Sequence, residues 1–131
     1  MIVVDTSVWI NHFRNDLTQS VRYLRSLDRP SEVLTGDLVL LEVLQGARDD
    51  RHSKQLETVL RAFPVVPMMS EPVAVEAARI YRVLRGDGFT IRKTVDLIIA
   101  TFCILNGHAL VQDDRDFRPI AERFDLRLLA I

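Results

Sequence analysis

The stretch Met1-Ile2-Val3-Val4-Asp5-Thr6-Ser7 decides the fold of this chain. Its three consecutive apolar residues with high β propensity predict a short strand buried on both faces, which is typical of a parallel sheet. A carboxylate follows where this strand should end. Because open α/β sheets bind ligands at the carboxyl ends of their strands, Asp5 is a candidate site residue. A second interpretation stays open, since Asp is also a preferred N-cap and a helix is predicted from Val8.

The same pattern returns near the other end of the sequence. Ala109-Leu110-Val111 predicts another buried strand, and three acids follow it, namely Asp113, Asp114 and Asp116. Short apolar runs at 33–34, 65–66 and 126–131 predict further strands, and amphipathic helical patterns separate them. Alternating short strands and helices predict a three-layer α/β/α fold with a short, mainly parallel central sheet and right-handed crossovers.

One further acid lies inside an apolar run. Glu42 is in the middle of residues 38–45, whose length, with Gly46 after it, predicts a buried helix. A buried carboxylate without a partner is costly, so Glu42 should meet a cation, a hydrogen-bond donor or water. The alternative is a half-exposed polar edge that Glu42 shares with Gln45.

Asp96 lies in the first turn of a helix predicted from Val95 to Leu105, with Thr94 as its N-cap. An acid at this position also interacts favourably with the helix dipole, which is the purely structural interpretation. However, Asp96 shares a helical face with small and apolar residues, including Cys103. The spacing therefore predicts that Asp96 points inward.

The composition limits the class of protein and the class of site. With 131 residues, 48% hydrophobic and 27% charged, the sequence predicts one globular domain over 1–131. No apolar run approaches the roughly 20 residues of a membrane span, and no signal peptide is recognisable, so we expect a cytoplasmic protein. The single cysteine excludes an internal disulfide, and the three scattered histidines argue against zinc. Cys103 is predicted to be a core residue.

The candidate acids predict a hard metal ion. Like charges that converge cannot all stay ionised without a cation, and all candidate ligands are oxygens. Such a donor set favours Mg²⁺ or Mn²⁺, one or two ions, over zinc or copper. A site of about four carboxylates suits the hydrolysis of phosphodiester bonds.

The charge distribution permits a polyanionic substrate. The formal net charge is -1, and if the four acids were neutralised by metal the remainder would carry +3. Cations also gather between positions 79 and 93, directly before the helix of Asp96, where they predict a rim that holds phosphate. Ordinary solvation of a helix face is the alternative. These cations are Arg79, Arg82, Arg85, Arg92 and Lys93.

Four blocks of the sequence resemble those of PIN-domain ribonucleases, specifically the VapC toxins of toxin-antitoxin pairs. The blocks run from Met1 to Ile10, Glu42 to Gly46, Thr94 to Ala100 and Asp114 to Phe117. They lie in the same order and spacing as in that family, so the resemblance covers nearly the whole chain. The resemblance implies a PIN-like fold, a homodimer, cleavage of structured RNA, either tRNA or rRNA, and inhibition by a VapB-type antitoxin.

The resemblance also implies roles for individual residues. It implies that Asp5, Glu42, Asp96 and Asp114 hold Mg²⁺ or Mn²⁺ and carry the catalysis. Asp116 would be an accessory acid and Thr6 a hydrogen-bonding support. The sequence departs from the family at Gln112, where Thr or Ser is common; an amide at this position can still donate a hydrogen bond.

Three other functions fit the residues less well. Haloacid dehalogenase-type phosphohydrolases need a second Asp two residues after the first, where this chain has Ser7. Receiver domains of response regulators need an acidic pair at the first strand end, and Val4-Asp5-Thr6 offers one acid. A catalytically inert PIN domain that binds RNA or protein predicts the loss of at least one acid, and all four are present. This alternative stays open, because the acids can also be retained in a protein whose groove is always occupied.

Overall fold

The computed structural model describes residues 1–130, and its centre is a five-stranded parallel sheet with the strand order β3-β2-β1-β4-β5. The three inner strands are completely buried, whereas the two edge strands are short and half-buried. Part of the last predicted strand, Ile131, lies outside the described residues. The strands are β1 (Ile2–Val4), β2 (Val33–Gly36), β3 (Val65–Val66), β4 (Ala109–Val111) and β5 (Leu128–Leu129).

Strand β1 lies where the strand order changes direction. The chain adds β2 and β3 on one side of β1, and then returns to add β4 and β5 on the other side. Val3 is accordingly in register with both Leu34 and Leu110. At such a switch point the segments after two neighbouring strands diverge and leave a crevice between them. The residues that follow β1 and β4 border this crevice.

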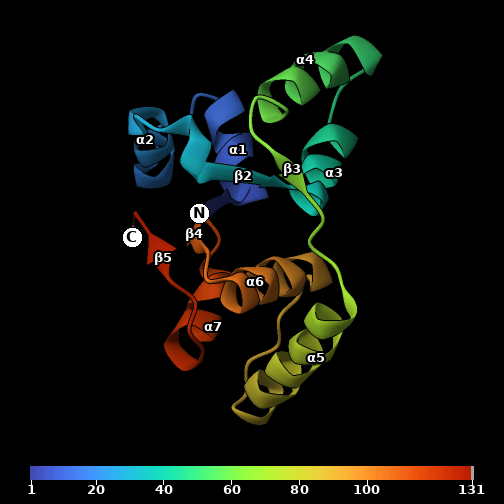
Figure 1. The fold of residues 1–131 in the computed structure, drawn as a ribbon, viewed down its shortest axis with the longest axis vertical. Coiled ribbons are helices and arrows are strands. Elements are labelled where there is room, and N and C mark those ends of the chain that lie inside the picture. The colour runs from blue at the N-terminus through green and yellow to red at the C-terminus, as the bar shows by residue number, and fades with distance from the viewer. Residues whose placement is uncertain (131) are drawn as a thin grey trace.

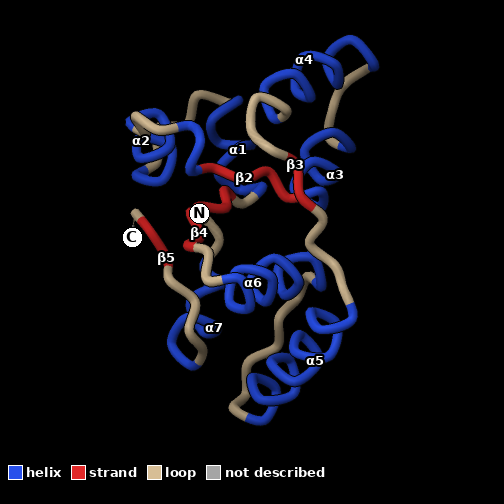
Figure 2. The backbone as a smooth tube through the Cα atoms, in the orientation of Figure 1, coloured by secondary structure: helices blue, strands red, loops and turns tan. Residues whose placement is uncertain are grey.

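Helices cover both faces of the sheet, as Figures 1 and 2 show. Helices α1 to α4 lie on one side of the strands, and α5 to α7 lie on the other side, so the predicted three-layer architecture is confirmed. Two single turns of 3-10 helix, at Pro30–Glu32 and Arg115–Phe117, complete the structure. The helices are α1 (Thr6–Phe13), α2 (Gln19–Ser26), α3 (Asp37–Gln45), α4 (Asp50–Leu60), α5 (Glu71–Gly86), α6 (Thr94–Asn106) and α7 (Arg118–Arg123).

Helix α6 is the central helix of its layer, with every residue from Asp96 to Cys103 buried. Cys103 is a free core residue as predicted, and burial raises the pKa of its thiol to about 12. The helix ends at Gly107, whose φ of 66° lies in the left-handed region that glycine adopts without strain. None of the helices in residues 1–130 is long and apolar enough to cross a membrane.

Two helix predictions need correction. Thr94 is not the N-cap of α6: it is the first helical residue, and the extended backbone of Lys93 precedes it without a capping side chain. Helix α3 forms as predicted but is not buried all round, because only Val39 and Val43 are fully buried and its leucines at 38, 40 and 44 pack against the core in part. Leu41 on its other side is 55% exposed.

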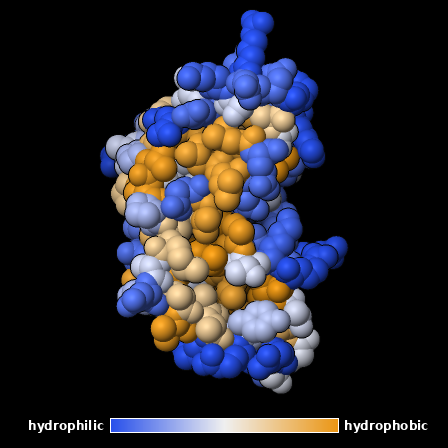
Figure 3. All heavy atoms as spheres, turned by 90° about the vertical axis from the view of Figure 1, so that its right-hand side faces the viewer, coloured by the Kyte–Doolittle hydropathy of each residue, from blue (hydrophilic) through white to orange (hydrophobic). Residues whose placement is uncertain are grey.

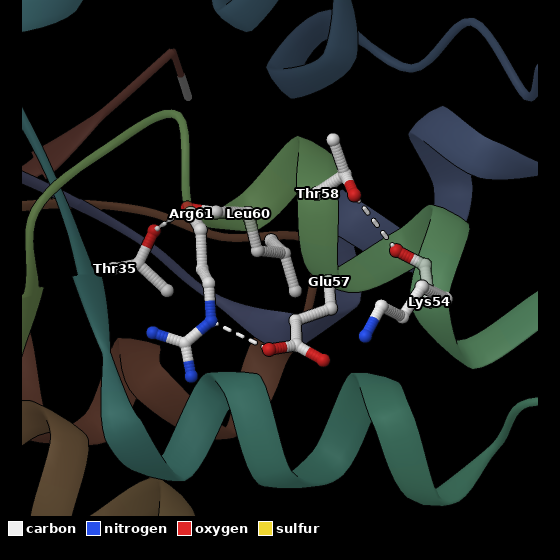
Figure 4. Close-up of polar contacts among 6 residues, drawn as sticks. All are labelled: Thr35, Lys54, Glu57, Thr58, Leu60 and Arg61. Atoms are coloured by element: carbon white, nitrogen blue, oxygen red, sulfur yellow. Dashed lines mark hydrogen bonds and ion pairs between the residues drawn. The ribbon is translucent and has the colours of Figure 1, made fainter. Parts of the chain in front are cut away.

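Helix α4 is attached to the sheet at its carboxyl end, as Figure 4 shows. The buried Thr35 of β2 donates a hydrogen bond of 2.9 Å from its hydroxyl to the carbonyl oxygen of Leu60. On the exposed side of the same helix, Arg61 pairs with Glu57 at 2.6 Å. Exposed pairs of this kind contribute little to stability, so the buried Thr35 contact is the stronger anchor.

Candidate functional site

A cavity of about 530 Å³ opens at the carboxyl ends of β1 and β4, at the switch point of the sheet. All four predicted acids line it, although they are separated by up to 109 residues in the sequence. Two of the predicted cations line it as well. These six residues are Asp5, Glu42, Asp96, Asp114, Arg92 and Lys93.

Asp5 is both a helix cap and a site residue, so the two interpretations of its sequence position are compatible. It is 2% exposed, and its Oδ2 atom accepts hydrogen bonds from the backbone N–H and the hydroxyl of Ser7, at 3.1 and 2.6 Å. Its other oxygen, Oδ1, is buried without any hydrogen-bond partner. A buried polar atom without a partner carries a large desolvation cost, which is typical of an atom reserved for a ligand.

Ser7 joins the two strand ends that form the cavity. Its hydroxyl donates to Asp5 and accepts a hydrogen bond of 3.0 Å from the backbone N–H of Asp113, which follows β4. The sequence analysis assigned no role to Ser7. A hydroxyl two residues after a capping acid signals only a local contact, and its partner 106 residues away became evident only from the fold.

Glu42 is half-buried and lines the cavity from α3. Its Oε1 atom accepts a hydrogen bond of 2.7 Å from the hydroxyl of Thr6, the donor that its apolar surroundings require. Thr6 therefore holds Glu42 towards the end of β1, in agreement with the supporting role expected for Thr6.

Asp96 reaches the cavity from the first turn of α6 and is 5% exposed, so the predicted inward orientation is confirmed. Its Oδ2 atom is the second buried carboxylate oxygen of the site without a partner. Burial and the charges of Asp5 and Asp114 raise the pKa of Asp96 to about 7. Burial, with a smaller contribution from the charge of Glu42, raises the pKa of Asp5 to about 6.

The segment after β4 supplies the remaining acids. Asp96, Asp114 and Asp116 each present one carboxylate oxygen within 4.8 Å of the others. Asp114 also caps the 3-10 turn, since its Oδ1 accepts a hydrogen bond of 3.0 Å from the backbone N–H of Asp116. Asp116 pairs on its outer side with Arg92 at 3.3 Å. Asp116 thus lies close enough to take part in the acidic cluster.

The unusual Gln112 is 6% exposed and supports Asp114. Its side-chain oxygen accepts a hydrogen bond of 2.6 Å from the backbone N–H of Asp114. The amide therefore contacts the fourth acid as an acceptor, and not as the donor that the sequence analysis expected. A hydroxyl oxygen at this position could accept the same bond, so the departure from the family preserves one contact.

Asp113 belongs to the scaffold around the cavity. Its Oδ2 atom accepts hydrogen bonds from the side chains of Asn11, at 2.9 Å, and Thr18, at 2.7 Å. These contacts tie the segment after β4 to helix α1 and to the start of α2. Asp113 thus lines the cavity with one oxygen already committed to structural contacts.

The predicted basic rim divides into two groups. Arg92 and Lys93 line the acidic cavity, but Arg82 and Arg85 do not. Arg82 borders a different, mainly apolar groove, and Arg85 lies over the ring of Tyr81. Arg79 pairs with Glu76 and lies over the ring of Phe124.

The donor set fits a hard divalent cation. Six acids are present in or beside one cavity, and their donor atoms are carboxylate oxygens, which Mg²⁺ and Mn²⁺ prefer. The two buried oxygens without partners, on Asp5 and Asp96, are the atoms whose desolvation a cation would offset. Neither a thiol nor an imidazole lines this cavity among the described residues.

Comparison with known proteins agrees with this geometry. The family model of the PIN domain matches residues 2–123. VapC ribonuclease Mb1587 of Mycobacterium bovis is 31% identical over 129 residues, which cover 97% of this chain and 96% of that protein. Ribonuclease VapC11 of Mycobacterium tuberculosis matches with the same identity and coverage.

Solved structures show the same fold. The structure of VapBC-1 from nontypeable Haemophilus influenzae matches with a TM-score of 0.77 and 19% identity, over 98% of this chain and 96% of that one. The structure of Mycobacterium tuberculosis VapC20, described as a sarcin-ricin loop cleaving toxin, matches with a TM-score of 0.69 and 19% identity, over 95% and 96%. The family match and the identity to the curated relatives extend over nearly the whole chain. The chain therefore belongs to the PIN-domain family, within the group of VapC ribonucleases.

Proposed function

We propose that this protein is a metal-dependent endoribonuclease and the toxin of a toxin-antitoxin pair. One observation carries the proposal: two buried carboxylate oxygens, on Asp5 and Asp96, lack a hydrogen-bond partner among residues 1–130, in a cavity lined by three further acids. Such an arrangement is electrostatically unfavourable unless a cation neutralises it. The family relationship supports RNA as the substrate of this site.

In this proposal, Asp5, Glu42, Asp96 and Asp114 hold one or two Mg²⁺ or Mn²⁺ ions, and Asp116 is an accessory acid. Bound metal of this kind supplies an activated water and stabilises the leaving oxygen of a phosphodiester. Thr6 holds Glu42 in position, and Ser7 fixes Asp5 so that one oxygen stays available. Arg92 and Lys93 border the cavity where they can bind the phosphates of the strand.

The proposed substrate is structured RNA, either tRNA or rRNA. The cavity is polar and open, and its rim carries cations from the segment before α6, which suits a polyanion. The structural neighbour VapC20 is described as cleaving the sarcin-ricin loop, which supports a structured RNA target for a site built on the same fold.

The proposed partners are a VapB-type antitoxin and a second copy of the chain. Several structural neighbours were solved as VapBC complexes, which supports the antitoxin. Figure 3 shows a continuous apolar area on the side that carries α3, the segment after β3 and α5. Leu41, Met69 and Val75, which belong to these elements, are 55, 52 and 72% exposed. Large exposed apolar areas often mark protein–protein interfaces. This area is the proposed homodimer interface.

The proposal is tested by incubating the purified, antitoxin-free protein with total cellular RNA. We expect discrete fragments with Mg²⁺ or Mn²⁺, none with EDTA, and none with Asp5→Ala or Asp96→Asn at matched folding. Asp96→Asn should also abolish growth arrest on expression without antitoxin. Cleavage that persists in EDTA or in Asp96→Asn would exclude the carboxylate mechanism, and intact RNA with retained binding would favour an inert RNA-binding domain.

A further inference from the structure

A second cavity of about 220 Å³ lies directly beside the acidic one. The two cavities share Asp113 and Arg115, so they are neighbours along the segment after β4. Its walls come from the start of α2, the segment after β4, the start of α7 and the residue after β5. Residues that line this second cavity include Ser20, Gln112, Asp113, Arg115, Arg118 and Ala130.

The second cavity has two arginines that no acid of residues 1–130 pairs with. Arg115 and Arg118 are both exposed, and neither forms a salt bridge within the described part of the chain. In contrast, Arg92 and Arg123 pair with Asp116 and Asp87. Two guanidinium groups without acidic partners at one cavity are suited to an anion with several oxygens.

Gln112 adds a buried donor to the second cavity. The side chain is 94% buried, and its oxygen already accepts a hydrogen bond from the N–H of Asp114. This contact fixes the orientation of the amide, because an N–H can be met only by the oxygen. Its Nε2 group has no hydrogen-bond partner within residues 1–130. This nitrogen is also not completely enclosed by the protein, so a ligand can reach it. The amide N–H₂ group therefore remains available to a ligand in the cavity.

The acid in the second cavity does not cancel its positive charge. Asp113 contributes one negative charge against the two arginines, and its Oδ2 atom is held by Asn11 and Thr18. The balance of this cavity is positive, whereas the first cavity is lined by five acids and three cations. A phosphate is thus repelled by the first site without metal and attracted by the second.

We propose that the second cavity binds a backbone phosphate of the RNA strand next to the bond that is cleaved, through Arg115, Arg118 and the amide of Gln112. This inference rests on the proposed ribonuclease function, which places the cleaved bond in the first cavity. The shared wall at Arg115 favours a continuous strand over an acidic segment of a protein partner, since one nucleotide chain would follow both cavities in sequence.

The test measures RNA binding separately from cleavage. Arg118 lines the second cavity but not the first, so Arg118→Gln leaves the metal site intact. Arg118→Gln is introduced into an Asp96→Asn background, and the affinity for a fluorescein-labelled single-stranded RNA of about 12 nucleotides is measured over a series of salt concentrations. Arg61→Gln is the matched control, because Arg61 is an exposed arginine that follows α4, and its acidic partner among residues 1–130 is Glu57.

We expect Arg118→Gln to weaken RNA binding about fivefold and to reduce the slope of log affinity against log salt by about 0.7, the value for one lost phosphate contact on a single strand. Arg118→Glu should weaken binding further, and Arg61→Gln should behave as the parent. In the otherwise unchanged protein, Arg118→Gln should raise KM for RNA and leave kcat within about twofold.

Equal RNA affinity and salt slope for Arg118→Gln and Arg61→Gln would overturn the inference. So would a loss of antitoxin affinity in Arg118→Gln with RNA binding unchanged, which would assign the cavity to an acidic segment of the partner. If the parent protein bound RNA through Arg118 but never cleaved it, the ribonuclease function would fail while the phosphate site stood.

Discussion

The two strand ends that form the acidic cavity use their acids in different ways. After β1 there is one acid, Asp5, which keeps one buried oxygen without a partner. After β4 there are three acids, and each has a different partner. Asp113 accepts hydrogen bonds from Asn11 and Thr18, Asp114 caps a 3-10 turn, and Asp116 pairs with Arg92. The number of acids at a strand end is therefore a poor guide to function. A better guide is how many hydrogen-bond donors the protein supplies to each acid, because an acid without donors keeps an oxygen available for a ligand.

The largest expected effect comes from replacing an aspartate by asparagine at each of the two strand ends and comparing the two variants. Asp5→Asn should lower RNA cleavage by at least about 100-fold, since the amide cannot hold a divalent ion as a carboxylate does. Asp113→Asn should keep cleavage within about threefold, because its oxygen still accepts hydrogen bonds from Asn11 and Thr18. Initial rates at saturating Mn²⁺ give the comparison, and circular dichroism controls for folding. Equal losses in both variants would remove the distinction between the two ends.

A second effect concerns the stability of the metal-free protein. The pKa values of Asp5 and Asp96, about 6 and about 7, lie above the ordinary value of 3.8, so the folded state binds more protons than the unfolded state between pH 4 and 7. Stability should therefore fall as the pH rises through this window, by roughly 3 kcal/mol for Asp5 and roughly 4 kcal/mol for Asp96. Asp96→Asn should lose much of this dependence and be the more stable protein at pH 8.

Denaturant unfolding in EDTA at pH 5 and pH 8 measures this difference, with Asp96→Asn as the reference for all other titrating groups. Addition of Mn²⁺ at pH 8 should restore the stability of the parent protein and leave that of the variant nearly unchanged. A parent protein that is as stable in EDTA at pH 8 as at pH 5, relative to the variant, would contradict the electrostatic cost assigned to the two acids.

The smallest expected effect comes from Ser7, the residue that joins the ends of β1 and β4. Ser7→Ala removes the hydroxyl that donates to Asp5 and accepts from the N–H of Asp113. We expect Mn²⁺ affinity to fall about tenfold, the size of one charge-assisted hydrogen bond, and Ser7→Thr to recover most of it. Isothermal titration calorimetry with Mn²⁺ distinguishes this from general destabilisation, which would lower the midpoint of unfolding with metal affinity unchanged. Such a result would make Ser7 a structural residue only.

Local sequence patterns predicted the parts of the molecule that local physics determines. The strands β1 and β4 are short runs of apolar residues, and the acids that follow them line the site because the carboxyl ends of parallel strands meet at one edge. Asp96 was predicted to point inward from helical periodicity, and its 5% exposure confirms this.

Long-range contacts could not be predicted in this way. The bond between Ser7 and Asp113 joins residues 106 positions apart, and the roles of Gln112 and Asp113 depend on which neighbours the fold brings to them. Helix α3 was expected to be buried because its sequence is almost wholly apolar, but one side of it remains exposed at Leu41. Apolar periodicity alone does not distinguish a core face from an interaction surface. Arg82 and Arg85 do not line the site for a related reason, since cations near in sequence diverge along a helix.

The pairing of β1 with β4 has a consequence for the order of synthesis. Ile2 is in register with Ala109, so the middle of the sheet closes only after about four-fifths of the chain has left the ribosome. Non-local pairings of this kind form late, because a long loop must be closed before they are stabilised. Until then Asp114 is not available to line the cavity with Asp5. The acidic cavity therefore cannot form on a nascent chain that ends before β4. Synthesis of most of the chain therefore precedes the formation of the acidic cavity.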